Sequence, residues 1–202
     1  MSGEQVKDLI NREHIVKALE LDLPYFDREM PRSGQEAAVL VLLSSDAQLL
    51  LTRRTETVDT HKGQIAFPGG RKDTDDAHAV ATALRETKEE VGVPPSEIEV
   101  VGEMPLFHIP ASGYQVVPVV GLLKPKRETV VLKPQLSETA EIFWVPLQFF
   151  LDEADYKVEL REYQGRSYPV HVYQWRSYRI WGATAFMIKN FCDRLKQVKS
   201  IY

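Results

Sequence analysis

The sequence predicts an α/β fold, with helices packed on both faces of a mixed sheet, and three observations lead to it. Short apolar stretches of strand length alternate with two longer segments of helical periodicity, residues 76–91 and 181–199. The chain has 202 residues, which is long enough for one well-buried α/β domain. No internal repeat and no interior linker interrupt it. We therefore expect a single α/β/α sandwich domain over residues 1–202.

The composition is that of an ordinary globular protein and excludes several functional classes. Hydrophobic residues make up 44% of the chain and the formal net charge is −4, so no basic surface for nucleic acid is expected. No apolar run reaches the roughly 18 residues of a membrane span, and the polar N-terminus lacks a signal-peptide core. The single Cys192 excludes a disulfide within the chain. We expect a cytoplasmic domain of the size of an enzyme, with no nucleic-acid or membrane partner.

The N-terminal segment is expected to form a helix followed by a β-hairpin. Residues 3–20 show the periodicity of an amphipathic helix, and we treat residues 1–30 as an elaboration of the domain. Two apolar stretches, 37–43 and 48–54, flank a Ser-Ser-Asp turn and predict a hairpin.

The central segment is expected to contain a short strand at 65–67, a Pro-Gly-Gly turn and a helix over 76–91. Asp75 or Asp76 is suited to cap the start of this helix, and Gly92 marks its end. The remaining elements follow in order: strands 98–105, 115–123 and 141–145, a short helix from 146, a hairpin of 157–163 and 167–175, and a C-terminal helix over 181–199.

Three carboxylates, Glu86, Glu89 and Glu90, occupy one turn of the helix predicted over 76–91. At about 100° per residue, the apolar positions form one stripe and the carboxylates fall on the opposite side. Glu86 and Glu90 are four residues apart, so they repel unless a cation or an arginine neutralises them. We predict a site for Mg²⁺ or Mn²⁺ with these two as primary ligands. The alternative is a solvated acidic helix face.

This segment resembles the Nudix box, GX5EX7REUXEEXGU, in which U is aliphatic. The matching positions at fixed spacing are Arg85, Glu86, Glu89, Glu90, Gly92 and Val93. The first half departs from the pattern, because the consensus Glu falls on Ala77 and the consensus Gly on Arg71. Gly70 lies one residue early, so the loop carries a one-residue insertion with several aspartates nearby. The resemblance implies a Nudix-type α/β/α sandwich with a mixed sheet.

The resemblance also implies roles for further residues. A backbone carbonyl at the Gly69 turn is expected to bind the metal ion, and glycine leaves room for it. Glu89 is expected to bind a second ion or to act as a base, and Arg85 to orient Glu89. The alternative for Arg85 is a simple surface ion pair. Many Nudix enzymes use a loop acid as a distal base, for which we prefer Glu138 to Glu141.

A second motif lies upstream. Residues 50–70, LLTRRTETVDTHKGQIAFPGG, resemble the signature of coenzyme A pyrophosphatases. Thr55 replaces a small residue of that signature, and Asp59 replaces an arginine. The charge reversal matters because coenzyme A carries a 3′-phosphate besides its diphosphate, and phosphates are bound by cations. The predicted substrate-binding residues of this segment are Arg53, Arg54, His61, Lys62 and Gly63.

The two resemblances imply hydrolysis of a small-molecule nucleoside diphosphate derivative. The leading substrate is coenzyme A or acyl-coenzyme A, with 3′,5′-ADP and 4′-phosphopantetheine or its acyl form as products. ADP-ribose, NADH or a dinucleoside polyphosphate is the alternative, because of Asp59. A third interpretation is a catalytically silent nucleotide-binding domain. The sequence is also compatible with a homodimer formed through the N-terminal helix or the C-terminal hairpin.

Overall fold

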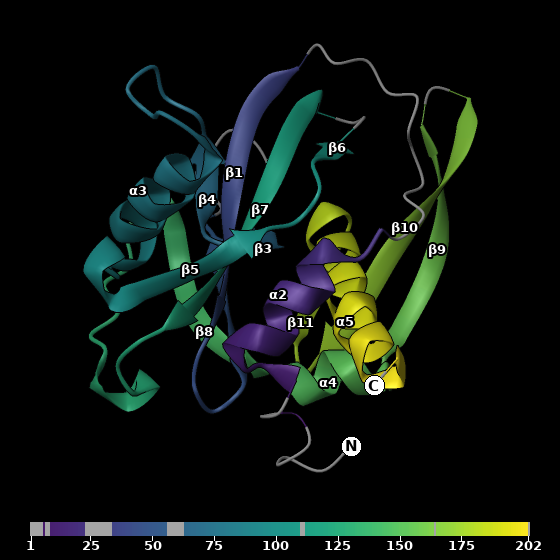
Figure 1. Ribbon diagram of the computed structural model, residues 1–202. Coiled ribbons are helices and arrows are strands. Elements are labelled where there is room, and N and C mark those ends of the chain that lie inside the picture. Colours follow the sequence, from purple (N-terminus) through teal and green to yellow (C-terminus); the bar gives the residue numbers. More distant parts are fainter. Residues whose placement is uncertain are drawn as a thin grey trace.

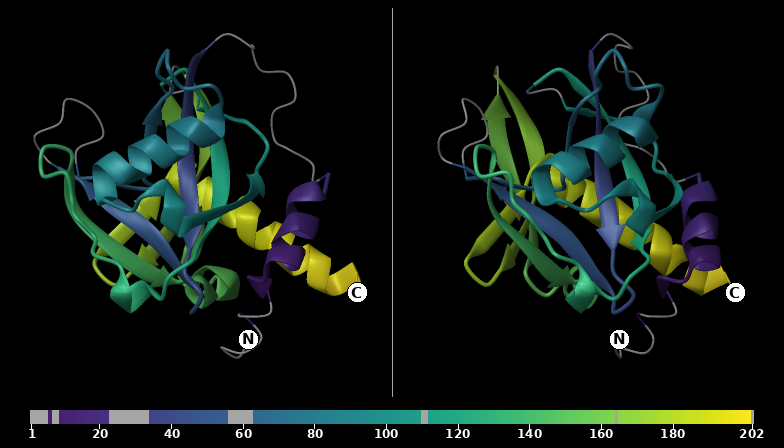
Figure 2. Two further views of the ribbon diagram at one scale, coloured as in Figure 1. Left: turned by 60° about the vertical axis from the view of Figure 1, so that its left-hand side comes forward. Right: turned by 90° about the vertical axis from the view of Figure 1, so that its left-hand side faces the viewer.

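The computed structural model describes residues 6, 9–22, 34–55, 63–109, 112–163 and 165–201. A large mixed sheet lies between two helical layers (Figures 1 and 2). Helix α3 covers one face of this sheet, and helices α2 and α5 lie on the other side together with a smaller sheet. This is the predicted arrangement of three layers.

The helices of the described chain are α2 (Arg12–Glu20), α3 (Ala79–Val91), α4 (Leu147–Asp152) and α5 (Ala183–Ile201), with 3₁₀ turns η1 (Pro95–Glu97) and η2 (Arg127–Thr129). The large sheet contains β1 (Gln35–Leu43), β2 (Gln48–Arg54), β3 (Ile65–Ala66), β4 (Gly69–Arg71), β5 (Ile98–Glu103), β6 (Phe107–Ile109), β7 (Tyr114–Leu123) and β8 (Thr139–Pro146). The small sheet contains β9 (Tyr156–Tyr163), β10 (Arg166–Trp175) and β11 (Tyr178–Trp181).

The large sheet follows the order β3-β2-β1-β7-β5, with β4 paired to β1, β6 to β7 and β8 to β2. Strands β1 and β7 are parallel and the other pairs are antiparallel, so the sheet is mixed. The predicted hairpin forms, but β1 and β2 are in register only at Leu43 and Leu49. Beyond that point the sheet forks, because β4 pairs with β1 while β3 pairs with β2.

Strand alternation divides the core into two clusters. Ala38, Leu40 and Leu42 of β1 pack on the α3 side, whereas Val41 and Leu43 belong to the larger cluster on the α5 side. Successive side chains of a strand point to opposite faces, so one apolar strand supplies both layers.

The N-terminal helix docks on the C-terminal helix through a buried arginine. Arg194 of α5 is 1% exposed, and its Nη1 donates to the carbonyl oxygens of Ala18 at 3.2 Å and Leu21 at 2.7 Å. His14 of α2 forms a second hydrogen bond, from its Nε2 to the carbonyl of Leu195 at 2.9 Å. These contacts attach the predicted elaboration to the domain.

Several predicted boundaries are wrong. Helix α3 begins at Ala79, and His78 caps it by accepting the amide of Ala81 at Nδ1, so neither Asp75 nor Asp76 is the cap. Strand β5 ends at Glu103. Three short strands, β4, β6 and β11, were not predicted. Residues 23–33, between the N-terminal helix and β1, lie outside the described residues.

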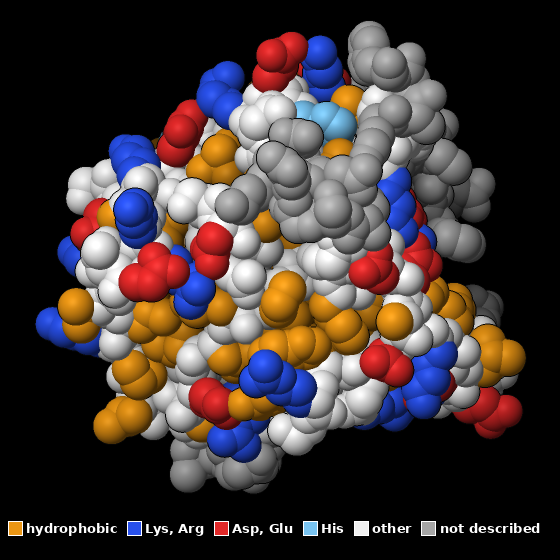
Figure 3. Space-filling model, turned by 90° about the horizontal axis from the view of Figure 1, so that it is seen from below, with side chains coloured by type: hydrophobic (Ala, Val, Ile, Leu, Met, Phe, Trp, Pro, Cys, Tyr) orange, Lys and Arg blue, Asp and Glu red, His pale blue; other side chains and the backbone are white. Residues whose placement is uncertain are grey.

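Apolar side chains are also present on the surface. Figure 3 shows a band of them on the underside of the molecule, with charged side chains on both sides of it. Among the described residues, the exposed large hydrophobic side chains are Leu106, Val131 and Leu136 in connecting segments and Val158 and Leu160 on β9. Among the described helices, none has the length and apolar character that crossing a bilayer requires. The homodimer stays a prediction.

Candidate active site

The carboxylates of α3 meet the glycines of β4. The amide of Gly69 donates to Glu90 Oε2 at 3.1 Å. A Cβ atom on Gly70 would lie 2.5 Å from Glu86 Oε1, so any side chain there would displace that carboxylate. The Pro-Gly-Gly segment is therefore not an isolated turn. It forms a strand, and the carboxylates of the helix pack against this strand.

Glu90 is buried, contrary to the prediction that all three carboxylates lie on the outer side of the helix. Its side chain is 6% exposed, whereas that of Glu89 is 50% exposed. The buried face of α3 also contains Thr82, Ala83, Thr87 and Val91. The face of the helix that packs on the sheet therefore contains polar side chains and one acid besides apolar side chains.

Burial changes the acidity of these groups. Removal from water raises the pKa of Glu90 to about 7, and the nearby charge of Glu86 adds to the shift, while the Gly69 amide opposes it. The pKa of Glu86 is also raised, again mainly by burial. Both acids lack sufficient neutralising charge, and a bound cation would supply it.

Arg85 is held at the centre of this acidic cluster. Its Nη1 lies 3.0 Å from Glu86 Oε1 and 3.1 Å from Glu89 Oε2, so the predicted pairing with Glu89 is present. Its Nη2 donates to Asp76 Oδ2 at 2.9 Å and to the carbonyl of Arg71 at 3.0 Å. Arg85 is far more than the simple surface ion pair of the alternative interpretation.

Asp76 is the residue of this network that the sequence analysis did not identify. It is 8% exposed, and the guanidinium of Arg85 lowers the pKa of its carboxyl well below the usual range. The consensus acid of the box falls on Ala77, which is exposed. Asp76 therefore supplies an acid one residue earlier, and allowing the motif to slip by one position would have found it.

The two candidate loop acids lie in different environments. Glu138 is fixed near the cluster, because its carbonyl accepts the amide of Thr55 at 2.9 Å and the amide of Gln135 is bonded to the carbonyl of Glu90 at 3.0 Å. Its charge contributes to the raised pKa values of Glu86 and Glu90.

Glu141 is instead engaged elsewhere. Its carboxylate accepts from Arg53 Nε at 3.2 Å and from the hydroxyl of Tyr178. The geometry therefore favours Glu138 over Glu141 as the acid that faces the cluster.

The two arginines of the upstream motif point in different directions. The pairing of β2 with β8 is irregular between Arg53 and Arg54. Arg53 is held by Glu141, whereas Arg54 Nη1 lies 3.9 Å from Glu90 Oε1. The structure brings Arg54, and not Arg53, to the carboxylates.

Three further residues were predicted to bind the substrate, and the structure describes one of them. Gly63 has a φ of 63°, a left-handed conformation that suits glycine. His61 and Lys62 lie outside the described residues, as does Asp59.

Comparison with known proteins identifies the family of the chain. The NUDIX domain family model matches residues 34–164, more than half of the chain. An uncharacterized Nudix hydrolase NudL of Photorhabdus laumondii is 35% identical over 190 residues, covering 93% of this chain and 100% of the relative. The chain is a Nudix hydrolase.

Further matches extend the likeness of this Nudix hydrolase. Nudix hydrolase 15, mitochondrial, of Arabidopsis thaliana is 35% identical over 167 residues, covering 79% of this chain and 57% of the relative. The crystal structure of a C. elegans Ap4A hydrolase binary complex aligns with a TM-score of 0.52 at 14% identity, covering 83% of this chain and 99% of that chain. The structural match confirms the predicted α/β fold with a mixed sheet.

The acidic cluster of the Nudix hydrolase fits a hard divalent cation in its donor chemistry. Carboxylate and carbonyl oxygens are the ligands that Mg²⁺ and Mn²⁺ prefer, and burial disfavours the charged forms of Glu86 and Glu90, which a nearby cation would favour. As positioned, no three acidic, histidine or cysteine side chains of the described residues are arranged to hold one ion. Instead Arg85 Nη1 joins Glu86 and Glu89.

Proposed function

We propose that this Nudix hydrolase cleaves the diphosphate of coenzyme A or acyl-coenzyme A. The expected products are 3′,5′-ADP and 4′-phosphopantetheine or its acyl form. The observation that carries the proposal is the meeting of the two motifs: Arg54 of the upstream signature lies beside Glu90, whose carboxylate accepts the amide of Gly69. A residue of the signature that resembles coenzyme A pyrophosphatases thus lies beside a carboxylate of the Nudix box.

In this proposal Glu86, Glu90 and the carbonyl of Gly69 hold Mg²⁺ or Mn²⁺, and Glu89 is a further ligand or a base. The ion, when bound, neutralises charge on the diphosphate and lowers the pKa of water. Arg85, fixed by Asp76, orients Glu86 and Glu89. Glu138 is the loop acid that takes up a proton at the cluster.

Arg54 is the proposed donor to the diphosphate. Its Nε is buried and has no partner within the described part of the chain, and its Nη1 is too far from Glu90 for a short hydrogen bond. An arginine with free donors binds phosphate oxygens in a fixed geometry. His61, Lys62 and Gly63 remain proposed contacts of the same loop. Arg53 stays a proposed contact but a secondary one, because Glu141 Oε2 already accepts from its Nε at 3.2 Å.

The second candidate keeps the chemistry and changes the substrate to ADP-ribose, NADH or a dinucleoside polyphosphate. Asp59 favours it, because a negative charge stands where the signature has an arginine. A carboxylate repels the 3′-phosphate that distinguishes coenzyme A from those substrates.

Product analysis separates the two candidates. The purified protein is incubated with Mg²⁺ and then with Mn²⁺, against coenzyme A, ADP-ribose and NADH in parallel. We expect release of 3′,5′-ADP from coenzyme A at the highest rate. Faster cleavage of ADP-ribose or NADH supports the second candidate, and no product from coenzyme A overturns the first.

A further inference from the structure

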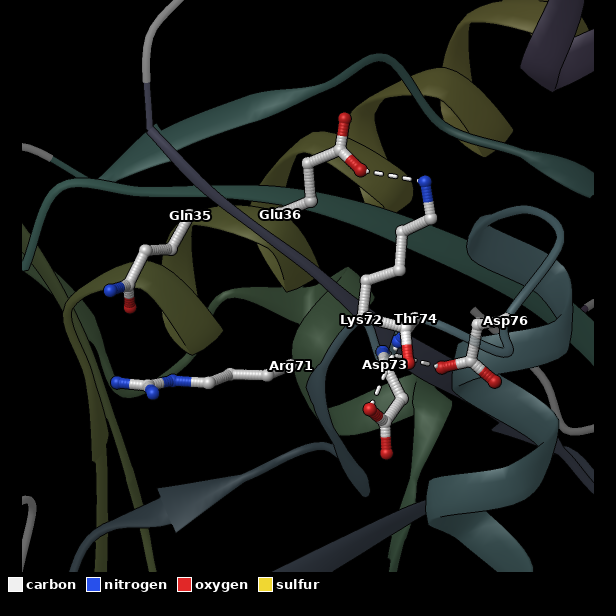
Figure 4. Close-up of a pocket in the computed structure, with 7 residues that line it drawn as sticks. All are labelled: Gln35, Glu36, Arg71, Lys72, Asp73, Thr74 and Asp76. Atoms are coloured by element: carbon white, nitrogen blue, oxygen red, sulfur yellow. Dashed lines mark hydrogen bonds and ion pairs between the residues drawn. The ribbon is translucent and has the colours of Figure 1, made fainter.

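A cavity of about 450 Å³ adjoins the outer side of the loop between β4 and α3 (Figure 4). Its lining residues are Gln35, Glu36, Arg71, Lys72, Asp73, Thr74 and Asp76. In Figure 4 the side chains of Arg71 and Gln35 extend in the same direction, away from Asp73 and Asp76. One end of the cavity is therefore cationic and amide-lined, and the other is acidic.

Most charges of this cavity are already neutralised. Lys72 Nζ lies 2.7 Å from Glu36 Oε2, and Asp76 is paired with Arg85. Asp73 accepts the amide of Thr74, and it is exposed to solvent, which screens its charge. Arg71 is the cation that remains.

Arg71 is oriented by a tyrosine and keeps free donors. Its Nε donates to the hydroxyl of Tyr114, and its guanidinium carbon lies 5.4 Å from the centre of the Tyr114 ring. Within the described residues, neither Nη group of Arg71 has a protein acceptor. A guanidinium fixed at one nitrogen with two free ends suits a phosphate, which accepts from both.

This arginine also belongs to the strand of the carboxylate cluster. Its backbone carbonyl accepts from Arg85 Nη2 at 3.0 Å, and it follows directly after Gly70, which packs against Glu86. The register of β4 places Arg71 opposite Ala37, near the edge where Gln35 and Tyr114 are paired. Arg71 is therefore the next residue along the strand after the two glycines at which the diphosphate is proposed to lie.

We propose that Arg71, oriented by Tyr114, binds a phosphate monoester on the ribose of the substrate. This inference rests on the proposed coenzyme A hydrolysis and specifies how the 3′-phosphate is recognised. It also accounts for Asp59, because Arg71 supplies a cation that the upstream signature has lost. Gln35 contributes an amide donor to the same group.

The test compares coenzyme A with dephospho-coenzyme A, which lacks only the 3′-phosphate. Steady-state kinetics are measured for the wild type, Arg71→Gln and Arg71→Lys. The matched control is Arg176→Gln, which removes an exposed arginine that lies over Trp175 at 4.5 Å, at the β10–β11 turn. Thermal unfolding of each variant verifies that the fold is retained.

We expect Arg71→Gln to raise KM for coenzyme A about tenfold, because a hydrogen bond between charged groups is lost. Its kcat and its KM for dephospho-coenzyme A stay near the wild-type values. Arg71→Lys, which keeps the charge but not the planar fork, recovers part of the discrimination. Arg176→Gln leaves the ratio between the two substrates unchanged.

Two kinetic results overturn the inference while the proposed function stands. One is equal use of both substrates by the wild type, and the other is an equal loss on both substrates in Arg71→Gln. If the wild type hydrolyses neither coenzyme A nor dephospho-coenzyme A, the proposed substrate is wrong. The inference about Arg71 is then tested separately by calorimetry. Weaker binding of 3′,5′-ADP, but not of AMP, to Arg71→Gln supports the phosphate site, and unchanged binding overturns it.

Discussion

At the scale of single residues, Glu90 combines burial with a role that needs negative charge. Its neighbours within the fold, the Gly69 amide and Arg54, offset only part of the cost of burial. Such a carboxylate is poorly explained as a stabilising group, since a neutral residue of the same shape would fit the same place. Its burial is more readily explained by function.

Glu90→Gln is expected to abolish most turnover while leaving the fold intact. The amide keeps the volume and an oxygen for the Gly69 amide, but it loses the charge that the cation requires. Turnover and melting temperature are measured together. Glu103→Gln, an exposed acid of β5, is the control. A Glu90→Gln enzyme with near-wild-type turnover would contradict the assignment of Glu90 as a ligand.

Asp76→Asn is expected to destabilise the protein by about 1.5–3 kcal/mol at pH 7, the usual range for hydrogen bonds between charged groups. Arg85 lowers the pKa of Asp76 below the value near 3.9 of an unfolded chain, so this stability is present above that value. It is lost as pH falls through the lower pKa of the folded state. Unfolding by urea should therefore show the wild type and Asp76→Asn converging below about pH 4.

Turnover of Asp76→Asn should also fall, because Arg85 loses the partner that orients it towards Glu86 and Glu89. A variant with normal stability and normal turnover would mean that Asp76 has no positioning role. The predicted pairing of Arg85 with Glu89 is present and Glu86 joins it, whereas Glu90 lies on the buried side of the helix. The sequence did not reveal Asp76, since the fixed spacing of the motif pointed to Ala77.

At the scale of elements, β4 shows how three residues without periodicity become a strand. Gly69, Gly70 and Arg71 carry no alternating pattern, and their strand conformation comes from pairing with Val39, Ala38 and Ala37 of β1. The same holds for the short strands β6 and β11. Long apolar stretches such as those of β1 and β7 were predicted because their own sequence favours strands.

The two glycines of β4 are expected to respond differently to alanine. At Gly70 the new Cβ meets the Glu86 carboxylate, the far end of a side chain that can move aside. Gly70→Ala should therefore fold but lose turnover on the order of 100-fold, as misplaced catalytic groups do.

At Gly69 a Cβ would lie 2.4 Å from the carbonyl of Ala38, and φ is 153°. The backbone of β1 cannot yield in the same way, so Gly69→Ala should unfold or fail to accumulate as folded protein. Circular dichroism and turnover of the two variants provide the measurement. Equal behaviour of the two would contradict this account of β4.

At the scale of the whole molecule, Arg194 joins α2, the first described helix, to α5, the last, by hydrogen bonds. Arg194→Met keeps much of the side-chain volume but removes the donors to the Ala18 and Leu21 carbonyls. Each of the two carbonyls left without a donor costs about 1–3 kcal/mol, so a loss of roughly 2–6 kcal/mol is expected. The urea midpoint should fall while turnover at low temperature is retained, because α5 lies on the opposite side of the large sheet from α3, which carries the carboxylates (Figure 1).

Lys196→Met on the same helix is the control. Its Nζ contacts Glu153 in a half-exposed pair, and such pairs contribute at most about 1 kcal/mol. An Arg194→Met protein as stable as this control would show that the hydrogen bonds between Arg194 and the end of α2 are not required for stability. The docking of α2 was beyond sequence reasoning, because it depends on contacts between residues about 175 positions apart.

The fork between β1 and β2 has a consequence for how the site tolerates change. Where a sheet is continuous, its amides and carbonyls are used by neighbouring strands; at the fork the amide of Gly69 serves Glu90 instead. Main-chain groups are the same in every residue except proline, so substitution rarely removes them. The sequence departs from its two motifs at the side-chain positions Ala77 and Asp59, whereas the part of the site built from backbone groups is insulated from such substitutions.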